Sequence, residues 1–229
     1  MNSDYPCQVL FYIDNDIMLN DSKSILCMFS GGLDSLGVLY RLLTATEYSD
    51  YDIHVHHMHL MNREDRTEAE AHAVESVLPV IQKLTCRNIR YTENLVEYRF
   101  LKSKFVWDMD LAAFMAANIV REYQDIAKVA MGRTRTDIED GSIQFFDRME
   151  RAQNLYEMTL SLEKDFIMPE RIFPVADLTK AEIYKMLPEE VRACAWSCRE
   201  PVYFDHAPPQ KCGKCHTCQD LKRMEDELV

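Results

Sequence analysis

Apolar positions along the chain follow two patterns, short continuous runs and residues spaced three or four apart. Runs typical of strands occur at 25–29, 52–60 and 127–131, with shorter candidates at 7–13 and 88–92. Residues 25–29 are apolar throughout, which predicts a strand buried on both faces of a parallel sheet. Leu36, Leu39 and Leu43 then show the spacing of a helix that follows this strand.

Two segments carry the pattern of a helix capping box. They pair Asp65 with Glu68 and Thr179 with Glu182, and each predicts a helix start. Pro79 lies inside the first of these helices, so we expect a kink or a break there. Further helices are expected around 111–119 and over 142–164, and the helix that begins at Thr179 should end before Pro188.

The alternation of strands and helices predicts an α/β fold, with a parallel sheet covered by helices on both faces. This rhythm stops after residue 193, where prolines and cysteines predict an irregular tail held together by a metal. We therefore expect an N-terminal extension at 1–24 with a possible edge strand, an α/β domain at 25–193, and a zinc-binding segment at 194–229.

Charge and composition narrow the class of protein. The chain has 229 residues and a net charge of −12, which argues against a nucleic-acid partner because phosphate-backbone binding uses clustered Lys and Arg. We see no apolar run near the roughly 18 residues of a membrane span, and no signal peptide at the N-terminus. We expect a cytoplasmic protein without a membrane partner, acting on a small molecule, and the sequence allows a homodimer.

The residues after the first buried strand suggest a phosphate site. Their sequence is Ser30-Gly31-Gly32-Leu33-Asp34-Ser35, between that strand and a helix start. Adjacent glycines let backbone amides converge on phosphate oxygens, and the helix N-terminus favours an anion. Asp34 would repel a phosphate unless a divalent cation such as Mg²⁺ bridged the two. The alternative is an ordinary Gly-Gly turn in which Ser35 caps the helix.

This loop resembles the signature of the PP-loop ATP pyrophosphatases. The resemblance implies that the loop grips the β- and γ-phosphates of ATP while a substrate oxygen attacks the α-phosphorus. It also implies a role for Lys180, which matches the family's Thr-Lys-x-Glu pattern; the alternative is a solvated lysine. Asp34 and Lys180 are the catalytic candidates. The residues predicted to bind ATP are Phe29, Ser30, Gly31, Gly32, Leu33, Asp34, Ser35, Gly132 and Lys180.

Cysteines near the C-terminus have the spacing of a metal site. Cys212, Cys215 and Cys218 form C-x₂-C-x₂-C, in which a single turn can direct the sulfurs at one tetrahedral ion. A fourth ligand is needed, for which we favour Cys198 over Cys194. An iron–sulfur run would call for a further cysteine at position 222, which is a lysine. The pattern therefore favours structural Zn²⁺ over an iron–sulfur cluster or free thiols.

The tail and the loop together resemble the 7-cyano-7-deazaguanine synthases, a PP-loop family. The resemblance implies that 7-carboxy-7-deazaguanine is adenylated by ATP and amidated with ammonia, releasing AMP and pyrophosphate, and that the amide is then dehydrated to the nitrile. Residues 59–62 and 138–146 depart from the family pattern. Alternatives are a reaction that stops at the amide, a PP-loop enzyme with another substrate, as in tRNA thiolation, and a catalytically silent nucleotide-binding protein.

A few other side chains are candidates for contacts with the substrate. Arg133 could bind a carboxylate, Asp137 could accept from the amino edge of a guanine-like ring, and Trp107 could stack on that ring. Four histidines, at 54, 56, 57 and 59, fall on one strand. Because alternate residues face opposite sides of a strand, they cannot form a simple four-histidine metal site. We expect them to form hydrogen bonds or line a cleft.

Overall fold

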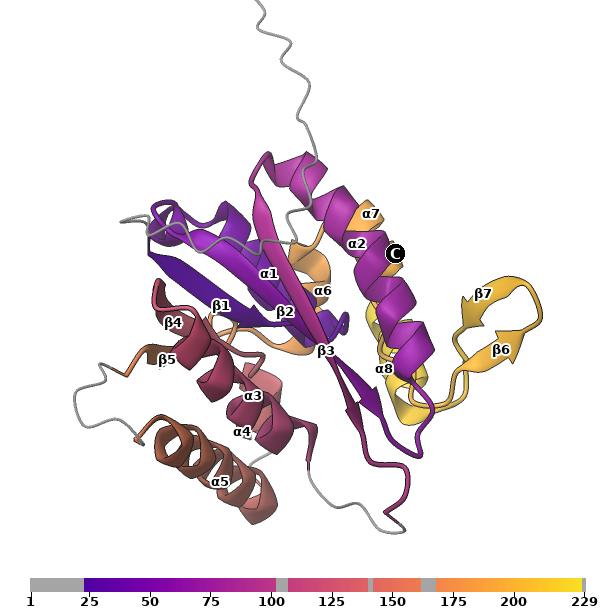
Figure 1. The fold of residues 1–229 in the computed structure, drawn as a ribbon. Coiled ribbons are helices and arrows are strands. Elements are labelled where there is room, and N and C mark those ends of the chain that lie inside the picture. The colour runs from indigo at the N-terminus through magenta and orange to yellow at the C-terminus, as the bar shows by residue number, and fades with distance from the viewer. Residues whose placement is uncertain (1–22, 102–106, 140–141, 162–167, 228–229) are drawn as a thin grey trace, which may run out of the picture.

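The sheet of this protein is parallel, as its apolar runs predict. The computed structural model describes residues 23–101, 107–139, 142–161 and 168–227. Within these ranges five strands pair in the order β3-β2-β1-β4-β5 (Figure 1). They are β1 (Ser24–Met28), β2 (Asp52–Met61), β3 (Ile89–Glu97), β4 (Ile126–Ala130) and β5 (Glu170–Ile172). The strand expected at 7–13 and most of the expected N-terminal extension lie outside the described residues.

Helices connect the strands and continue into the tail. They are α1 (Leu33–Thr44), α2 (Thr67–Thr85), α3 (Asp108–Glu122), α4 (Arg135–Glu139), α5 (Ile143–Leu160), α6 (Lys180–Met186), α7 (Glu189–Cys194) and α8 (His216–Asp226), with a short 3₁₀ helix at Thr46–Tyr48. Pro79 does not break α2, which runs through it. No helix in the described part of the chain is long and apolar enough to cross a membrane.

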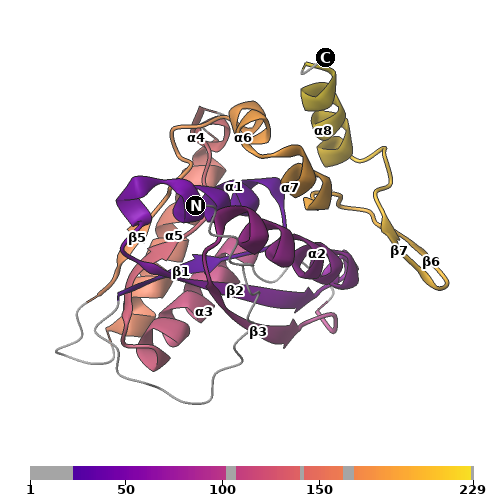
Figure 2. The ribbon, with the colours of Figure 1, turned by 90° about the horizontal axis from the view of Figure 1, so that it is seen from above.

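Side chains of β1 divide the core into two halves. Ile25 and Cys27 belong to a buried cluster with apolar residues of α1, α2 and α6, whereas Leu26 and Met28 belong to a second cluster with α3 and α5. Both faces of the sheet are therefore covered, as Figure 2 shows from above. This explains why residues 25–29 are apolar at every position. Each such side chain, when fully buried, contributes about 1.5–3 kcal/mol of transfer free energy.

The two predicted capping boxes have different outcomes. At α6 the box is confirmed, because the Thr179 hydroxyl accepts from the Glu182 N–H and the Glu182 carboxylate accepts from the Thr179 N–H. At α2 the prediction is wrong. Arg66 is the N-cap there, no side chain caps the helix, and Asp65 has a φ of 50° that turns the chain into it.

The tail is more regular than the sequence indicated. Residues between Cys198 and Cys212 form a hairpin of β6 (Val202–Phe204) and β7 (Ala207–Gln210), which extends away from the sheet in Figures 1 and 2. Helix α8 follows, and its Leu221 is buried in the same cluster as α1 and α2. The prediction of an irregular tail is therefore wrong, because Pro208 and Pro209 lie in β7 and α8 has an apolar anchor on the core.

The strand order positions a ligand site. Connections reverse direction between β1 and β4, and in open parallel sheets ligands bind beyond the carboxyl ends of strands at such a reversal. The loop after β1 and the residues after β4 meet there. The position that a Cβ of Gly132 would take lies 3.5 Å from the Cβ of Asp34.

Candidate functional site

The loop at residues 30–35 has the geometry of an anion cradle. Gly31 has a φ of +77°, and a Cβ there would lie 3.4 Å from the Glu70 carbonyl oxygen, so glycine fits this position best. Hydroxyls brace the loop internally: the Ser30 and Ser35 oxygens lie 3.1 Å apart, and the Ser35 hydroxyl donates to the Gly32 carbonyl at 3.0 Å. The loop is therefore held in one shape before any ligand arrives.

The N-terminus of α1 lies at a cavity of the structure. Gly32 is the N-cap, and no side chain caps the helix from that position. Ser35 is the third residue of the helix, so the alternative in which it is the N-cap is wrong. The first N–H groups of α1 have no partner within the helix, although the Leu33 N–H has the Ser197 hydroxyl at 3.5 Å. The positive end of the helix dipole lies beside the cavity, and this arrangement favours an anion.

Lys180, the first residue of α6, lies against two carboxylates. Its Nζ is 3.1 Å from Asp137 Oδ1 and 3.6 Å from Asp34 Oδ2. Burial opposes the charged lysine, but these neighbours raise the Lys180 pKa overall. Burial likewise acts to raise the pKa of Asp137, yet Lys180 and Thr134 hold it below its usual value. The ammonium group is thus charged and directed at the loop.

Asp34 has one oxygen ready for a further ligand. Burial raises the pKa of this carboxyl, and Lys180 acts in the opposite direction. Its Oδ1 is buried without a hydrogen-bond partner among the described residues. A buried carboxylate oxygen without a partner is costly unless something binds it, and a hard cation such as Mg²⁺ prefers this kind of ligand.

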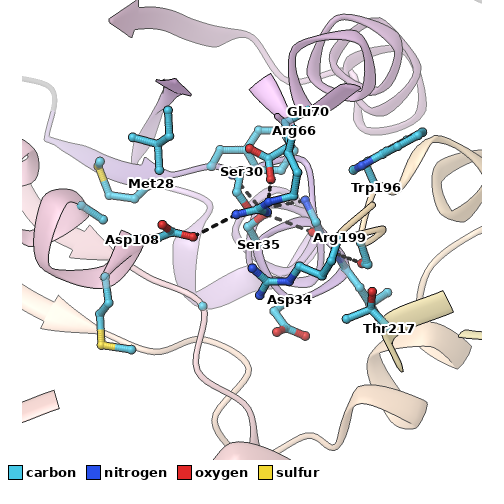
Figure 3. Close-up of a pocket in the computed structure, with 18 of the residues that line it drawn as sticks. Met28, Ser30, Asp34, Ser35, Arg66, Glu70, Asp108, Trp196, Arg199 and Thr217 are labelled. Atoms are coloured by element: carbon cyan, nitrogen blue, oxygen red, sulfur yellow. Dashed lines mark hydrogen bonds and ion pairs between the residues drawn. The ribbon is translucent and has the colours of Figure 1, made fainter. Parts of the chain in front are cut away.

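A cavity of about 350 Å³ opens in front of the loop (Figure 3). This volume is within the usual range of small-molecule sites, about 300–1,000 Å³. The predicted ATP-binding residues line it, with Gly31 as the exception, because the Cβ position of Gly31 faces α2. The lining residues from that prediction are Phe29, Ser30, Gly32, Leu33, Asp34, Ser35, Gly132 and Lys180.

The three predicted substrate residues lie at different places. Asp137 holds Lys180, and its other oxygen accepts from the Thr134 N–H and hydroxyl at 3.0 and 2.7 Å. Arg133 stacks on Phe173, with its guanidinium carbon 4.3 Å from the ring centre, and does not line the cavity at the loop. Trp107 lines a neighbouring cavity of about 790 Å³. The structure therefore does not bring these three residues together around one ligand.

An ionic cluster that sequence reasoning missed lines the other side of the cavity. Arg66 contacts three carboxylates: Glu64 at 2.8 Å, Asp108 at 3.2 Å, and Glu70. Burial raises the pKa of Glu70 to about 7, although Arg66 acts against this rise. The spacing of Arg66 and Glu70 by four residues was the signal in the sequence. It was hidden because the same segment also matched a capping box.

The four histidines of β2 are hydrogen-bonded, as expected. His54 and His56 share the Thr92 hydroxyl at 2.7 and 2.8 Å, whereas His57 bonds the Phe29 carbonyl at 2.9 Å on the opposite face. His59 lies 3.1 Å from Glu93. None of them belongs to a cluster of possible metal ligands within the described residues.

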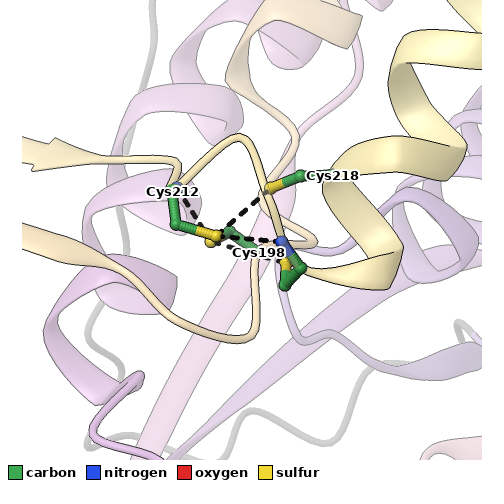
Figure 4. Close-up of side chains that lie close together, drawn as sticks. Cys198, Cys212 and Cys218 are labelled. Carbon is green, nitrogen blue, oxygen red and sulfur yellow. Dashed lines mark hydrogen bonds between the residues drawn. The ribbon is translucent and has the colours of Figure 1, made fainter.

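The metal-binding cysteines come together in the tail (Figure 4). The sulfur atoms of Cys198, Cys212, Cys215 and Cys218 all lie within 4.8 Å of one another. Cys194 is outside this group, and its thiol donates to the Glu190 carbonyl. Backbone N–H groups point at the sulfurs, with Cys215 donating to Cys212 at 3.3 Å and Cys212 to Cys198 at 3.3 Å. Such donors stabilise thiolates, the form that binds metals.

Solved structures with a similar fold belong to RNA-modifying proteins. One is a U34-tRNA thiolase, NcsA from Methanococcus maripaludis, with its [4Fe-4S] cluster, at 12% identity and a TM-score of 0.45, covering 90% of this chain and 65% of that one. Another is a 4-thiouridine synthetase in complex with RNA and ATP, at 15% identity and a TM-score of 0.48, covering 90% of this chain and 50% of that one. The chain thus spans two thirds or less of these proteins.

No curated protein matches the sequence significantly. A family model does: that of queuosine biosynthesis protein QueC matches residues 24–225, from the first residue of β1 into α8. This match covers the loop at residues 30–35, Lys180 and all four clustered cysteines, and it confirms the resemblance seen in the motifs. The chain belongs to the QueC family.

Proposed function

We propose that the protein is an ATP-dependent carbon–nitrogen ligase that acts on 7-carboxy-7-deazaguanine, toward 7-cyano-7-deazaguanine. The carboxylate oxygen of the base attacks the α-phosphorus of ATP, and the bond to pyrophosphate breaks. Ammonia then attacks the acyl carbon, AMP leaves, and an amide forms. A second activation by ATP would remove the amide oxygen and yield the nitrile.

The observation that carries this proposal is that the loop at residues 30–35, which we call the phosphate loop, lies with Lys180 at one cavity, in a chain of the QueC family. Donors fixed in advance around a leaving group stabilise the charge that develops on it. The N–H groups of the loop and the Lys180 ammonium are such donors for the β- and γ-phosphates. The loop connects the end of β1 to the start of α1, and Lys180 is the first residue of α6.

Charge around the cavity supports Mg²⁺ as a cofactor. Its lining residues include four carboxyl groups, those of Asp34, Glu70, Asp108 and Asp220, against the three cations Arg66, Lys180 and Arg199. The cavity therefore has little excess positive charge with which to neutralise a triphosphate, and a divalent cation would supply it. Asp34, whose Oδ1 has no hydrogen-bond partner among the described residues, would hold that cation, which supplies charge neutralisation to the phosphates.

The spacing of the sulfurs supports Zn²⁺ in the tail. Tetrahedral zinc with Zn–S bonds of about 2.3 Å separates its sulfurs by about 3.8 Å. The distances from Cys212 to Cys218 and from Cys215 to Cys198 are both 4.0 Å. In a [4Fe–4S] cluster each cysteine binds a different iron atom, which separates the sulfurs further. We therefore propose a structural zinc ion at this site.

A thiolation reaction fits the site less well. It would call for a reactive cysteine near the loop, and the cysteine of β1, Cys27, is fully buried. Burial raises the pKa of its thiol to about 12, so the nucleophilic thiolate is absent at neutral pH. The net charge of −12 also disfavours a polyanionic RNA substrate.

Incubation of the purified protein with MgATP and 7-carboxy-7-deazaguanine, with and without ammonium, tests the proposal. We expect AMP and pyrophosphate only when the base is present, and amide or nitrile product by mass spectrometry only when ammonium is present. Lys180→Ala should lower the rate by about 100-fold or more. Lys185→Ala, on the exposed side of the same helix, is the matched control and should retain the rate.

Two outcomes would revise the proposal. The absence of both AMP and pyrophosphate with the wild-type protein would refute the ligase reaction. AMP formation with amide as the final product would restrict the reaction to its first half.

A further inference from the structure

Arg199 connects the metal-binding tail to the nucleotide cavity. It directly follows Cys198, one of the four clustered cysteines, and its side chain lines both the cavity at the phosphate loop and the neighbouring larger one. Figure 3 shows the guanidinium reaching from the tail toward Asp34 and Ser35. Neither the motifs nor the family match assigns a role to this residue.

The segment that carries Arg199 is attached to the phosphate loop. The Trp196 N–H donates to the Gly31 carbonyl at 2.9 Å, and the Leu33 N–H donates to the Ser197 hydroxyl at 3.5 Å. A Cβ at Gly32 would lie 3.3 Å from the Trp196 carbonyl oxygen, so the two backbones approach closely. The loop and the residues just before Arg199 therefore form one unit.

The same segment is attached to the metal site on its other side. Cys198 contributes a sulfur, and the Arg199 N–H donates to the Cys215 sulfur at 3.5 Å. The backbone of Arg199 is thus held between the cysteine cluster and the loop. Its side chain extends into the cavity.

Charged partners distinguish Arg199 from the other cations of the cavity. Arg66 contacts three carboxylates and is 11% exposed, and Lys180 lies against two. Arg199 is 43% exposed, and within the described residues its guanidinium has one ion pair, with Glu64 at 3.4 Å. A guanidinium offers five N–H donors, so most of those on Arg199 can donate to a new ligand. Its charge also acts to lower the pKa of Asp34, which places it within electrostatic reach of the loop.

We propose that Arg199 is a nucleotide-binding residue whose guanidinium binds the β- or γ-phosphate oxygens of ATP, held in place by the metal site. This inference rests on the proposed function, because it requires ATP in the cavity. Arginine suits this role since its planar donors match phosphate oxygens in pairs. The metal would then contribute to ATP affinity without touching the nucleotide.

Calorimetric titration of the metal-loaded protein with MgATP and with AMP tests the proposal. Losing a charge-assisted hydrogen bond costs about 1.5–3 kcal/mol, so Arg199→Ala should weaken MgATP binding by about 10- to 150-fold. AMP lacks the β- and γ-phosphates, so its affinity should change less than about twofold if the variant keeps the site intact. Arg199→Lys should fall between wild type and Arg199→Ala, because it keeps the charge but not the planar donors.

The control and the metal content separate this role from a structural one. Lys222→Ala removes one positive charge from the exposed surface of α8 in the same tail and should bind MgATP as the wild type does. Wild-type affinity for MgATP in Arg199→Ala would overturn the proposal and leave the proposed function intact. Equal losses for MgATP and AMP, or loss of the metal, would reduce Arg199 to a structural role. Failure of the wild-type protein to bind MgATP would overturn both proposals.

Discussion

At the scale of single residues, the site depends on charges placed where local structure disfavours them. Lys180 begins α6, where the helix dipole opposes a cation. Asp34 and Asp137 compensate, at 3.6 and 3.1 Å from its ammonium. A triphosphate reaching the loop would meet an ammonium that these carboxylates have already positioned, so little reorganisation is needed on binding.

The buried histidines of β2 predict how stability depends on pH. Burial, with some help from Arg90, lowers the pKa of His54 to about 3. The pKa in the unfolded chain is about 6.5, so below that value the unfolded chain takes up a proton that the folded chain refuses. The contribution of His54 to the free energy of unfolding is therefore fully present above about pH 6.5. It falls on acidification, by about 1.4 kcal/mol per pH unit.

Urea unfolding at pH 7, 6 and 5 measures this effect. His54→Gln should make the free energy of unfolding less dependent on pH, although it loses the bond to Thr92. His72→Gln, on the exposed surface of α2, is the matched control and should keep the wild-type slope. A wild-type slope in His54→Gln would show that His54 does not carry the acid sensitivity.

At the scale of elements, the position of α6 depends on a glycine of α1. A Cβ at Gly37 would lie 2.6 Å from Cγ2 of Ile183, a fully buried residue of α6. Atoms cannot approach so closely, so α1 and α6 pack at this distance only because residue 37 has no side chain. Since α6 begins with Lys180, the contact sets the distance between the lysine and the loop.

Gly37→Ala should therefore destabilise the protein, although alanine is the better helix former. Overpacking costs about 1–3 kcal/mol, against a gain of about 1 kcal/mol in helix propensity. In an Ile183→Ala background the clash is removed, so the same substitution should become neutral or stabilising. Urea denaturation of the four proteins of this double-mutant cycle gives the coupling. Equal effects of Gly37→Ala in both backgrounds would contradict the packing argument.

At the scale of the whole molecule, the residues beside the metal site join the tail to the loop after β1. Trp196 and Ser197 lie next to the cysteine cluster and bond to the loop after β1. Although burial acts to raise it, hydrogen bonds from Thr217 and backbone N–H groups lower the pKa of Cys215 to about 5, which favours the thiolate. The tail therefore acts as part of the α/β domain and its loss should affect the entire fold.

Cys215→Ala should lose both the metal and the folded state. Structural zinc contributes about 10–16 kcal/mol in zinc-finger peptides, comparable with the usual free energy of unfolding of about 5–15 kcal/mol. Metal analysis and thermal unfolding measure the two losses. Cys194→Ser is the control, because Cys194 lies outside the cluster and should retain both properties. A metal-free Cys215→Ala variant with wild-type stability would refute a structural role for the metal.

Local spacing in the sequence was enough to predict the sheet, the glycine-bearing loop between β1 and α1, and three of the four clustered cysteines. Residues 25–29 are apolar throughout because both faces of β1 are buried, which any parallel sheet requires. The loop at 30–35 and Cys212, Cys215 and Cys218 could be recognised because each motif acts within a few residues of chain, so its geometry depends on local backbone.

Other features depended on contacts between distant segments, which only the tertiary structure decides. Both Cys194 and Cys198 were compatible with the spacing, and packing of the tail on the loop selects Cys198. Asp137 was expected to face the substrate, but the approach of α6 pairs it with Lys180. Arg199 enters the cavity because the tail folds back over the loop. Such positions are set by packing energies summed over the whole core, which no short stretch of sequence contains.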